Sequence, residues 1–126
     1  MVDASALVEV LLRGSRGATV QRRLEHAELA APDLINAEVV HAFRRLAASG
    51  AITPDHGRKA VARLAEAPIE RVTTARLTQA MWDLRHNLTA YDAAYIVLAR
   101  TLACPLVTID RRLAGAAGVG VEIVCL

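Results

Sequence analysis

Four acidic residues lie where carboxylates can take part in metal-assisted chemistry. Asp3 follows a short segment at the N-terminus, and Asp110 directly follows the apolar run Leu106–Ile109. Glu38 lies at the edge of the apolar stripe of a predicted helix, and Asp92 begins a helix that is otherwise apolar. A carboxylate in such surroundings needs a cation or several hydrogen-bond donors to stay ionised.

Each of these acids also has a purely structural alternative. Thr89–Asp92 matches a capping box, and the two acids that follow apolar segments both precede predicted helices, where they would serve as N-caps. Glu38 would pair with Arg45 or His41. For any one acid the structural role is the more common one, but four such placements together favour a shared site.

A shared site of four carboxylates indicates a hard metal ion. The charges would repel each other strongly unless a multivalent cation lay among them. Oxygen ligands without His or Cys suit Mg²⁺, or Mn²⁺, rather than zinc. The four histidines show no zinc-ligand spacing, and Cys104 and Cys125 are expected to be buried free thiols. The predicted chemistry is phosphodiester or phosphoryl transfer, with metal-bound water as the nucleophile.

The elements that must position these acids alternate between helix and strand. Hydrophobic periodicity, caps and breakers predict helices over residues 5–12, 18–27, 33–49, 53–67, 74–86, 89–103 and 110–116, and strands over residues 29–31, 69–72, 105–109 and 119–124. This alternation predicts one α/β domain over residues 1–126, a parallel sheet with helices on both faces. Sites in such sheets form beyond the carboxyl ends of the strands, where Asp3 and Asp110 are expected.

Composition limits the class of protein. The chain has 126 residues, is 54% hydrophobic and has a net charge of +2, which suits one small globular domain. The longest apolar runs have only about seven residues, as in Ala93–Ala99, so no transmembrane helix is expected. Asp3 and Glu9 argue against a signal peptide, so we expect a cytoplasmic protein. The high apolar content predicts exposed apolar patches, and therefore a protein partner or oligomer.

Four blocks of sequence together resemble a known family. The blocks are Val2–Leu7, Asn36–Val39, Leu88–Tyr95 and Leu106–Leu113. In this order and at this spacing they resemble the PIN-domain ribonucleases, and specifically the VapC-type toxins of prokaryotic toxin–antitoxin pairs. Each short motif alone is unspecific, but the ordered set extends across the whole chain.

The resemblance implies a fold and a set of site residues. The fold is PIN-like, a three-layer α/β/α arrangement with a parallel sheet of about five strands. The implied metal ligands and catalytic acids are Asp3, Glu38, Asp92 and Asp110. In the family the last of these acids often contacts the metal through water. Ser5 and Thr108 match small hydroxyl positions beside the acids, where they would orient carboxylates or hold a metal-bound water.

The resemblance also implies an activity. It is that of a Mg²⁺-dependent endoribonuclease that acts on single-stranded parts of tRNA or ribosomal RNA, leaves a 3′-hydroxyl and a 5′-phosphate, and inhibits translation. The candidates for RNA contacts are Arg111, Arg112 and Arg85. The alternative for these arginines is an exposed, hydrated position on the surface with no role in binding. Phe43 and Trp82 are predicted to lie in the core, so little aromatic stacking on RNA is expected.

Two partners follow from the resemblance, a VapB-type antitoxin and a second copy of the toxin. The antitoxin is expected to cover the acidic site. A helical antitoxin segment would fit between the apolar parts of three predicted helical regions, Leu7–Leu12, Val20–Leu29 and Ile52–Leu64.

The alternative function is a catalytically silent, metal-binding α/β interaction module, either PIN-like or receiver-like. A receiver domain would need paired acids after its first strand and a lysine after its last. In this sequence Ala4 follows Asp3, and the only lysine, Lys59, lies in mid-chain in a predicted helix. The residues therefore favour the nuclease.

Overall fold

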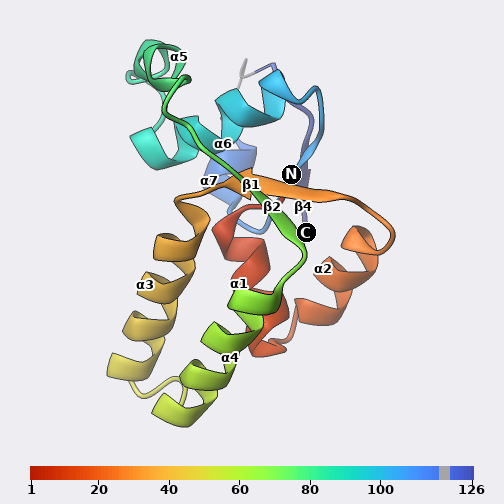
Figure 1. The fold of residues 1–126 in the computed structure, drawn as a ribbon, viewed down its shortest axis with the longest axis vertical. Helices are drawn as coiled ribbons and strands as arrows, with labels where there is room; N and C mark the ends of the chain where they lie inside the picture. Colours follow the sequence, from red (N-terminus) through yellow and green to blue (C-terminus); the bar gives the residue numbers. More distant parts are fainter. Residues whose placement is uncertain (117–119) are drawn as a thin grey trace.

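Helices and strands alternate along the chain in a computed structural model, which describes residues 1–116 and 120–126 (Figure 1). The helices are α1 (Ala4–Leu12), α2 (Gly17–Leu24), α3 (Ile35–Ala48), α4 (Pro54–Glu66), α5 (Thr78–Asp83), α6 (Ala90–Thr101) and α7 (Arg111–Ala114). The strands are β1 (Leu29–Pro32), β2 (Ile69–Val72), β3 (Leu106–Thr108) and β4 (Ile123–Cys125). The predicted α/β class is confirmed.

The strands form two parallel pairs, β1 with β2 and β3 with β4. The N-terminal residues connect the pairs. The Val2 N–H donates to the Ala30 carbonyl of β1 at 3.2 Å, and the Asp3 N–H donates to the Val107 carbonyl of β3 at 3.1 Å. The first residues of the chain therefore lie between β1 and β3.

The expectation of one sheet of about five strands is wrong for this structure. Within the described residues there are four strands in two-stranded sheets, and Val2 makes a single parallel bridge to Val107. The reason is length. Helix α1 begins at Ala4, so too few residues precede it to build a ladder of strand hydrogen bonds.

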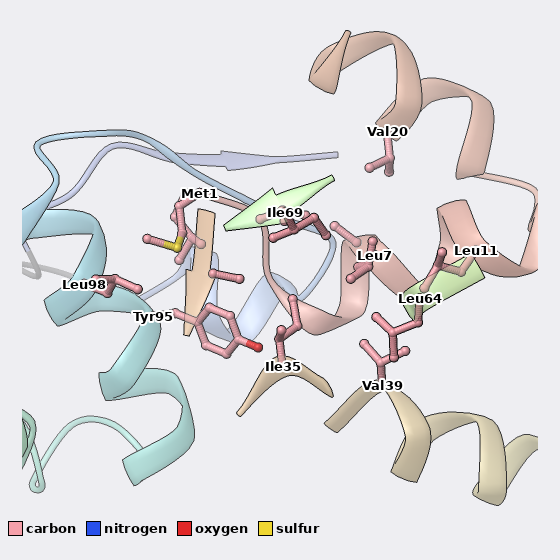
Figure 2. Close-up of a cluster of buried hydrophobic side chains, with 14 of the residues drawn as sticks. Met1, Leu7, Leu11, Val20, Ile35, Val39, Leu64, Ile69, Tyr95 and Leu98 are labelled. Atoms are coloured by element: carbon pink, nitrogen blue, oxygen red, sulfur yellow. The ribbon is translucent and has the colours of Figure 1, made fainter. Parts of the chain in front are cut away.

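The core lies where α1 packs against α2, α3 and α4, and where α6 packs against β1 and β3. Figure 2 shows Leu7 and Leu11 of α1 near Leu64 of α4 and Val39 of α3. In α6 every side chain of Ala93–Ala99 is buried, as its apolar sequence predicted. This packing holds the N-terminal ends of α1 and α6, where Asp3 is the N-cap of α1 and Asp92 lies in the first turn of α6.

Local signals predicted the hairpin of α3 and α4 well (Figure 1). Gly50 follows α3 with a φ of +75°, a conformation that glycine adopts without a steric penalty. Thr53 caps α4 by accepting a hydrogen bond from the His56 N–H at 3.1 Å, and Pro54 occupies the first turn.

Two predicted elements have different bounds in the structure. The helix expected over residues 74–86 is only Thr78–Asp83. Helix α5 buries none of its residues completely and packs mainly on α6, so it lacks the packing that stabilises longer helices. The strand expected over residues 119–124 begins at a residue outside the described ranges, and the observed strand is Ile123–Cys125.

Two burial predictions are also wrong. Phe43 is buried as expected, but Trp82 of α5 is 62% exposed. Cys104 and Cys125 are both free, yet Cys104 is only half-buried and Cys125 is exposed. Within the described residues, α5 packs mainly on α6, which leaves Trp82 uncovered, and β4 pairs with β3 alone, which leaves Cys125 at the edge of its sheet.

Arg71 of β2 ties its strand to the end of α4. The guanidinium donates to the carbonyl oxygens of Leu64, Ala67 and Ile69 at 2.7, 3.0 and 2.8 Å, and to Asn36 Oδ1 at 3.2 Å. Carbonyl groups at the end of a helix lack their usual partners within the helix, and this side chain gives those of Leu64 and Ala67 an additional hydrogen bond.

We expect Arg71→Met to lower the free energy of unfolding by about 2 kcal/mol, since hydrogen bonds to charged groups contribute about 1.5–3 kcal/mol. Urea unfolding followed by circular dichroism measures it. The matched control is Arg58→Met on the exposed side of α4, with an expected change below about 0.5 kcal/mol. An equal loss in both variants would contradict the role given to Arg71.

Candidate active site

Asp3 is a buried carboxylate at the N-terminus of α1, with 5% of its surface exposed. Its oxygens accept hydrogen bonds from Ser5 Oγ at 2.8 and 2.9 Å, from the Ala6 N–H at 2.8 Å and from Thr108 Oγ1 at 2.5 Å. These donors come from α1 and from the end of β3. They orient the carboxylate and compensate for much of its lost hydration.

The hydroxyls of Ser5 and Thr108 also bind the backbone that leads to Asp110. Thr108 Oγ1 accepts from the Asp110 N–H at 2.9 Å, and Ser5 Oγ accepts from the Ile109 N–H at 3.2 Å. The two hydroxyl oxygens lie 3.3 Å apart. The structure thus brings Asp3, Ser5, Thr108 and the backbone of Asp110 into one hydrogen-bonded cluster.

Asp110 serves as the N-cap of α7. Its Oδ1 accepts from the Arg112 N–H at 2.8 Å, and its Oδ2 pairs with the Arg112 guanidinium at 2.9 Å. The hydrogen bond from the Arg112 side chain is the main reason why the pKa of Asp110 lies below its ordinary value. The capping alternative for this acid therefore describes its local contacts correctly.

Asp92 lies in the first turn of α6, half-buried. The Thr89 hydroxyl accepts from the Asp92 N–H at 3.1 Å and donates to Asp92 Oδ2 at 2.8 Å. This arrangement is the capping box that the sequence predicted. It occupies one carboxylate oxygen and leaves the other without a contact to Thr89.

Glu38 of α3 is held by a residue that sequence reasoning missed. Tyr95 of α6 donates its hydroxyl to Glu38 Oε2 at 2.6 Å, whereas Arg45 and His41 were the expected partners. Tyr95 is 3% exposed and lies in the otherwise apolar run Ala93–Ala99. A lone hydroxyl in a buried helix was the available signal, because a buried phenol requires a hydrogen-bond partner.

The four acids interact electrostatically. Burial raises the pKa of Asp3 above its ordinary value, and the charge of Asp110 adds to the effect. Burial also raises the pKa of Glu38, with further contributions from Asp3 and Asp92. Acids from four separate segments thus form one region of mutual repulsion. Burial is also the main reason that the pKa of the Tyr95 phenol lies far above its ordinary value, so the phenol stays protonated as a donor.

Comparison with known proteins establishes the family. The family model described as "PIN domain" matches residues 1–119. The chain belongs to the PIN-domain family. As predicted from the four sequence blocks, it is similar to ribonucleases of the VapC type. Ribonuclease VapC1 of Mycobacterium tuberculosis (strain ATCC 25618 / H37Rv) is 42% identical over 98% of this chain and 94% of the relative.

Two further relatives from the same strain agree with this assignment. Ribonuclease VapC12 is 37% identical over 98% of this chain and 95% of the relative. Ribonuclease VapC9 is 38% identical over 90% of this chain and 87% of the relative. The PIN domain described here is therefore a member of the VapC family over nearly its full length.

The donor set of this PIN domain fits a hydrated, hard cation. Among residues 1–116 and 120–126, no three His, Cys, Asp or Glu side chains are arranged as a ready-made metal cage. Mg²⁺ keeps several waters and is usually bound through one or two carboxylates and substrate phosphates. All four candidate acids offer oxygen, and a divalent cation would favour the charged forms of Asp3 and Glu38, whose pKa values are raised mainly by burial and further by neighbouring acids.

The candidate RNA-binding arginines lie on two elements. Arg111 and Arg112 begin α7 and are exposed, with 87% of the Arg112 side chain accessible. Arg85 follows α5 and lies over the Trp82 ring, 4.9 Å from its centroid. The rim of the acidic site therefore carries positive charge beside Asp110.

The receiver-like alternative finds no support in the position of the lysine. Lys59 lies in α4, where it forms an exposed ion pair with Asp55 at 2.8 Å.

None of the helices in the described ranges has the length and apolar character of a membrane span.

We expect Thr108→Val to destabilise the protein by about 1–3 kcal/mol, because it removes one hydrogen bond to the buried Asp3 carboxylate and takes the acceptor away from the Asp110 N–H. Thr108 is fully buried, and valine has nearly the same shape. Thermal unfolding measures the change. Thr101→Val is the control, since it removes only one hydrogen bond, to the Val97 carbonyl, at the exposed end of α6. If the Thr108→Val protein is as stable as this control, the hydrogen bonds of Thr108 to Asp3 and Asp110 do not stabilise the fold as we expect.

Proposed function

We propose that this PIN domain is the toxin of a type II toxin–antitoxin pair, a Mg²⁺-dependent endoribonuclease in which Mn²⁺ can replace Mg²⁺. The observation that carries the proposal is the hydrogen-bonded cluster in which Ser5 and Thr108 join Asp3 to the backbone of Asp110, with Glu38 held by Tyr95 of α6. The similarity to VapC ribonucleases supports the same activity. The proposed catalytic acids and metal ligands are Asp3, Glu38, Asp92 and Asp110.

The proposed mechanism assigns separate tasks to the residues around the acids. A bound Mg²⁺ supplies Lewis acidity for phosphodiester hydrolysis. Ser5 and Thr108 keep the Asp3 carboxylate in one orientation, and Tyr95 does the same for Glu38. Orientation by such surrounding groups is what makes a ligand set effective.

Arg112 links the acidic cluster to the substrate. In this structure it neutralises Asp110, but its exposed side chain can rotate to bind an RNA phosphate. Arg111 and Arg85 would add further phosphate contacts, which position the RNA without reading its sequence. The proposed substrate is tRNA or ribosomal RNA, cut in the cytoplasm to leave a 3′-hydroxyl and a 5′-phosphate, so that translation stops.

The proposed partner is a VapB-type antitoxin. A groove of about 440 Å³ lies among α1, α2, β1 and α4. Its apolar lining includes Leu7, Leu11, Leu24, Leu29 and Ile69. An amphipathic helix would bury its apolar face in such a groove. This is the surface where the sequence predicted an antitoxin segment, and we also propose that the toxin forms a homodimer.

RNA cleavage by the purified protein tests the activity directly. We expect cleavage of total cellular RNA with Mg²⁺ or Mn²⁺ and none with EDTA. Asp92→Asn should reduce the rate by at least about a hundredfold, since even residues outside the ligand shell contribute about 10–100-fold. Asp55→Asn, which only breaks an exposed ion pair with Lys59, is the matched control.

Two results would reject this mechanism. Cleavage that survives both EDTA and Asp92→Asn would exclude the carboxylate-bound metal. A folded wild-type protein that binds Mn²⁺ and cleaves no cellular RNA would favour the silent interaction module.

Metal binding should also stabilise the fold. At a Mg²⁺ or Mn²⁺ concentration about 100 times Kd, we expect a gain of about 2.7 kcal/mol, measured as an increase in Tm. Asp3→Asn should abolish the gain, whereas Glu70→Gln, an exposed charge on β2, should keep it. Equal gains in both variants would place the metal elsewhere.

A further inference from the structure

Helix α5 exposes an aromatic ring that is paired with a cation. Trp82 is the only tryptophan of the chain and is 62% exposed, although tryptophan is highly buried on average. The guanidinium carbon of Arg85 lies 4.9 Å from the centroid of the Trp82 ring. Because the guanidinium lies over one face of the ring, a planar ligand would stack on the other face, with the positive charge near enough to attract an anionic group.

A cavity adjoins this pair. Its volume is about 300 Å³, and its lining residues are Thr78, Met81, Trp82, Arg85, Leu88 and Ala90. Apolar side chains, one indole ring and one guanidinium group therefore surround a space large enough for a single planar ring system. Among the described residues that line it, Arg85 carries the charge, and that charge is positive.

The cavity adjoins the proposed active site through α6. Helix α5 packs against α6, and Ala90 and Asp92 both lie in the first turn of α6. Tyr91, between them, is also 62% exposed. A nucleotide seated in the cavity would thus lie at the end of α6 that carries Asp92.

We infer that the cavity binds an unpaired nucleobase of the RNA, stacked on Trp82, while Arg85 contacts the adjoining phosphate. This inference rests on the proposed ribonuclease function and names the part of the substrate that this side of the site recognises. In a duplex the base faces are already stacked on each other, so only an unpaired base can present a face to the indole. The new element is therefore the place of the contact, a single unpaired base held between α5 and the start of α6.

Trp82 fluorescence provides a direct test, because all tryptophan emission comes from this residue. The probe is a short unstructured RNA, titrated into the Asp92→Asn protein with Mg²⁺ so that cleavage is suppressed. We expect saturable quenching by the unstructured RNA and none by a fully paired duplex of the same sequence. Equal quenching by both, or quenching by neither, would overturn the inference.

Variants separate stacking from a general loss of structure. Trp82→Ala should raise the Kd for the unstructured RNA by about tenfold or more, and Trp82→Phe should restore most of the affinity, because phenylalanine still stacks. The control is Leu102→Ala, which changes another exposed apolar residue at the opposite end of α6. The Kd of the Leu102→Ala protein for the unstructured RNA should stay within about twofold of the parent value, because Leu102 is remote from the proposed base contacts.

A second copy of the chain is the other molecule that would fit against the cavity, and sedimentation velocity on the same variants tests for it. If Trp82→Ala changes the oligomeric state and the RNA affinity follows that change, the cavity is an interface between copies and the inference fails. Failure of the ribonuclease proposal is distinguishable from this. If the wild-type protein cleaves no RNA but its fluorescence is quenched only by unpaired RNA, the base-binding cavity is supported and the ribonuclease proposal is rejected.

Discussion

The structure depends on one buried carboxylate. Asp3 ends the N-terminal segment between β1 and β3, begins α1, and accepts hydrogen bonds from both α1 and β3. A buried charge without partners would cost several kcal/mol. Its donors Ser5 and Thr108 are therefore required by the fold as much as by any chemistry. The same hydroxyls bind the backbone next to Asp110, so stabilising one acid also positions another.

Helix capping and an active site are compatible uses of the same acids. Asp3 and Asp110 each satisfy N–H groups at the start of a helix, and the Thr89 hydroxyl does so for Asp92. A carboxylate has about four acceptor positions, of which Asp92 uses one and Asp110 two in these contacts, whereas Asp3 accepts four. Rigid capping then becomes an advantage, since it fixes the direction of the remaining lone pairs. For Asp92 and Asp110, therefore, the structural and functional interpretations do not compete.

What the sequence predicted well depends on local signals. Gly50, Thr53 and Pro54 mark the boundaries of α3 and α4, and the apolar run in α6 predicts its burial. What it missed depends on distant contacts. Tyr95 meets Glu38 across 57 positions in the sequence, and no periodicity encodes that pair. Trp82 is apolar by type but exposed, because the short α5 lacks enough neighbours to cover it.

Charge distribution explains how a chain with a net charge of +2 could engage RNA. Nonspecific nucleic-acid binding normally relies on many phosphate contacts, and such a charge supports few. Four of the thirteen acids are proposed to lie at one site, where a cation would neutralise them, so the arginines dominate the surrounding surface. Arg112 pairs with Asp110, and Arg85 pairs with an aromatic ring. Affinity would then come from a few contacts close to the scissile bond, where they also position the substrate, instead of from a broad basic face.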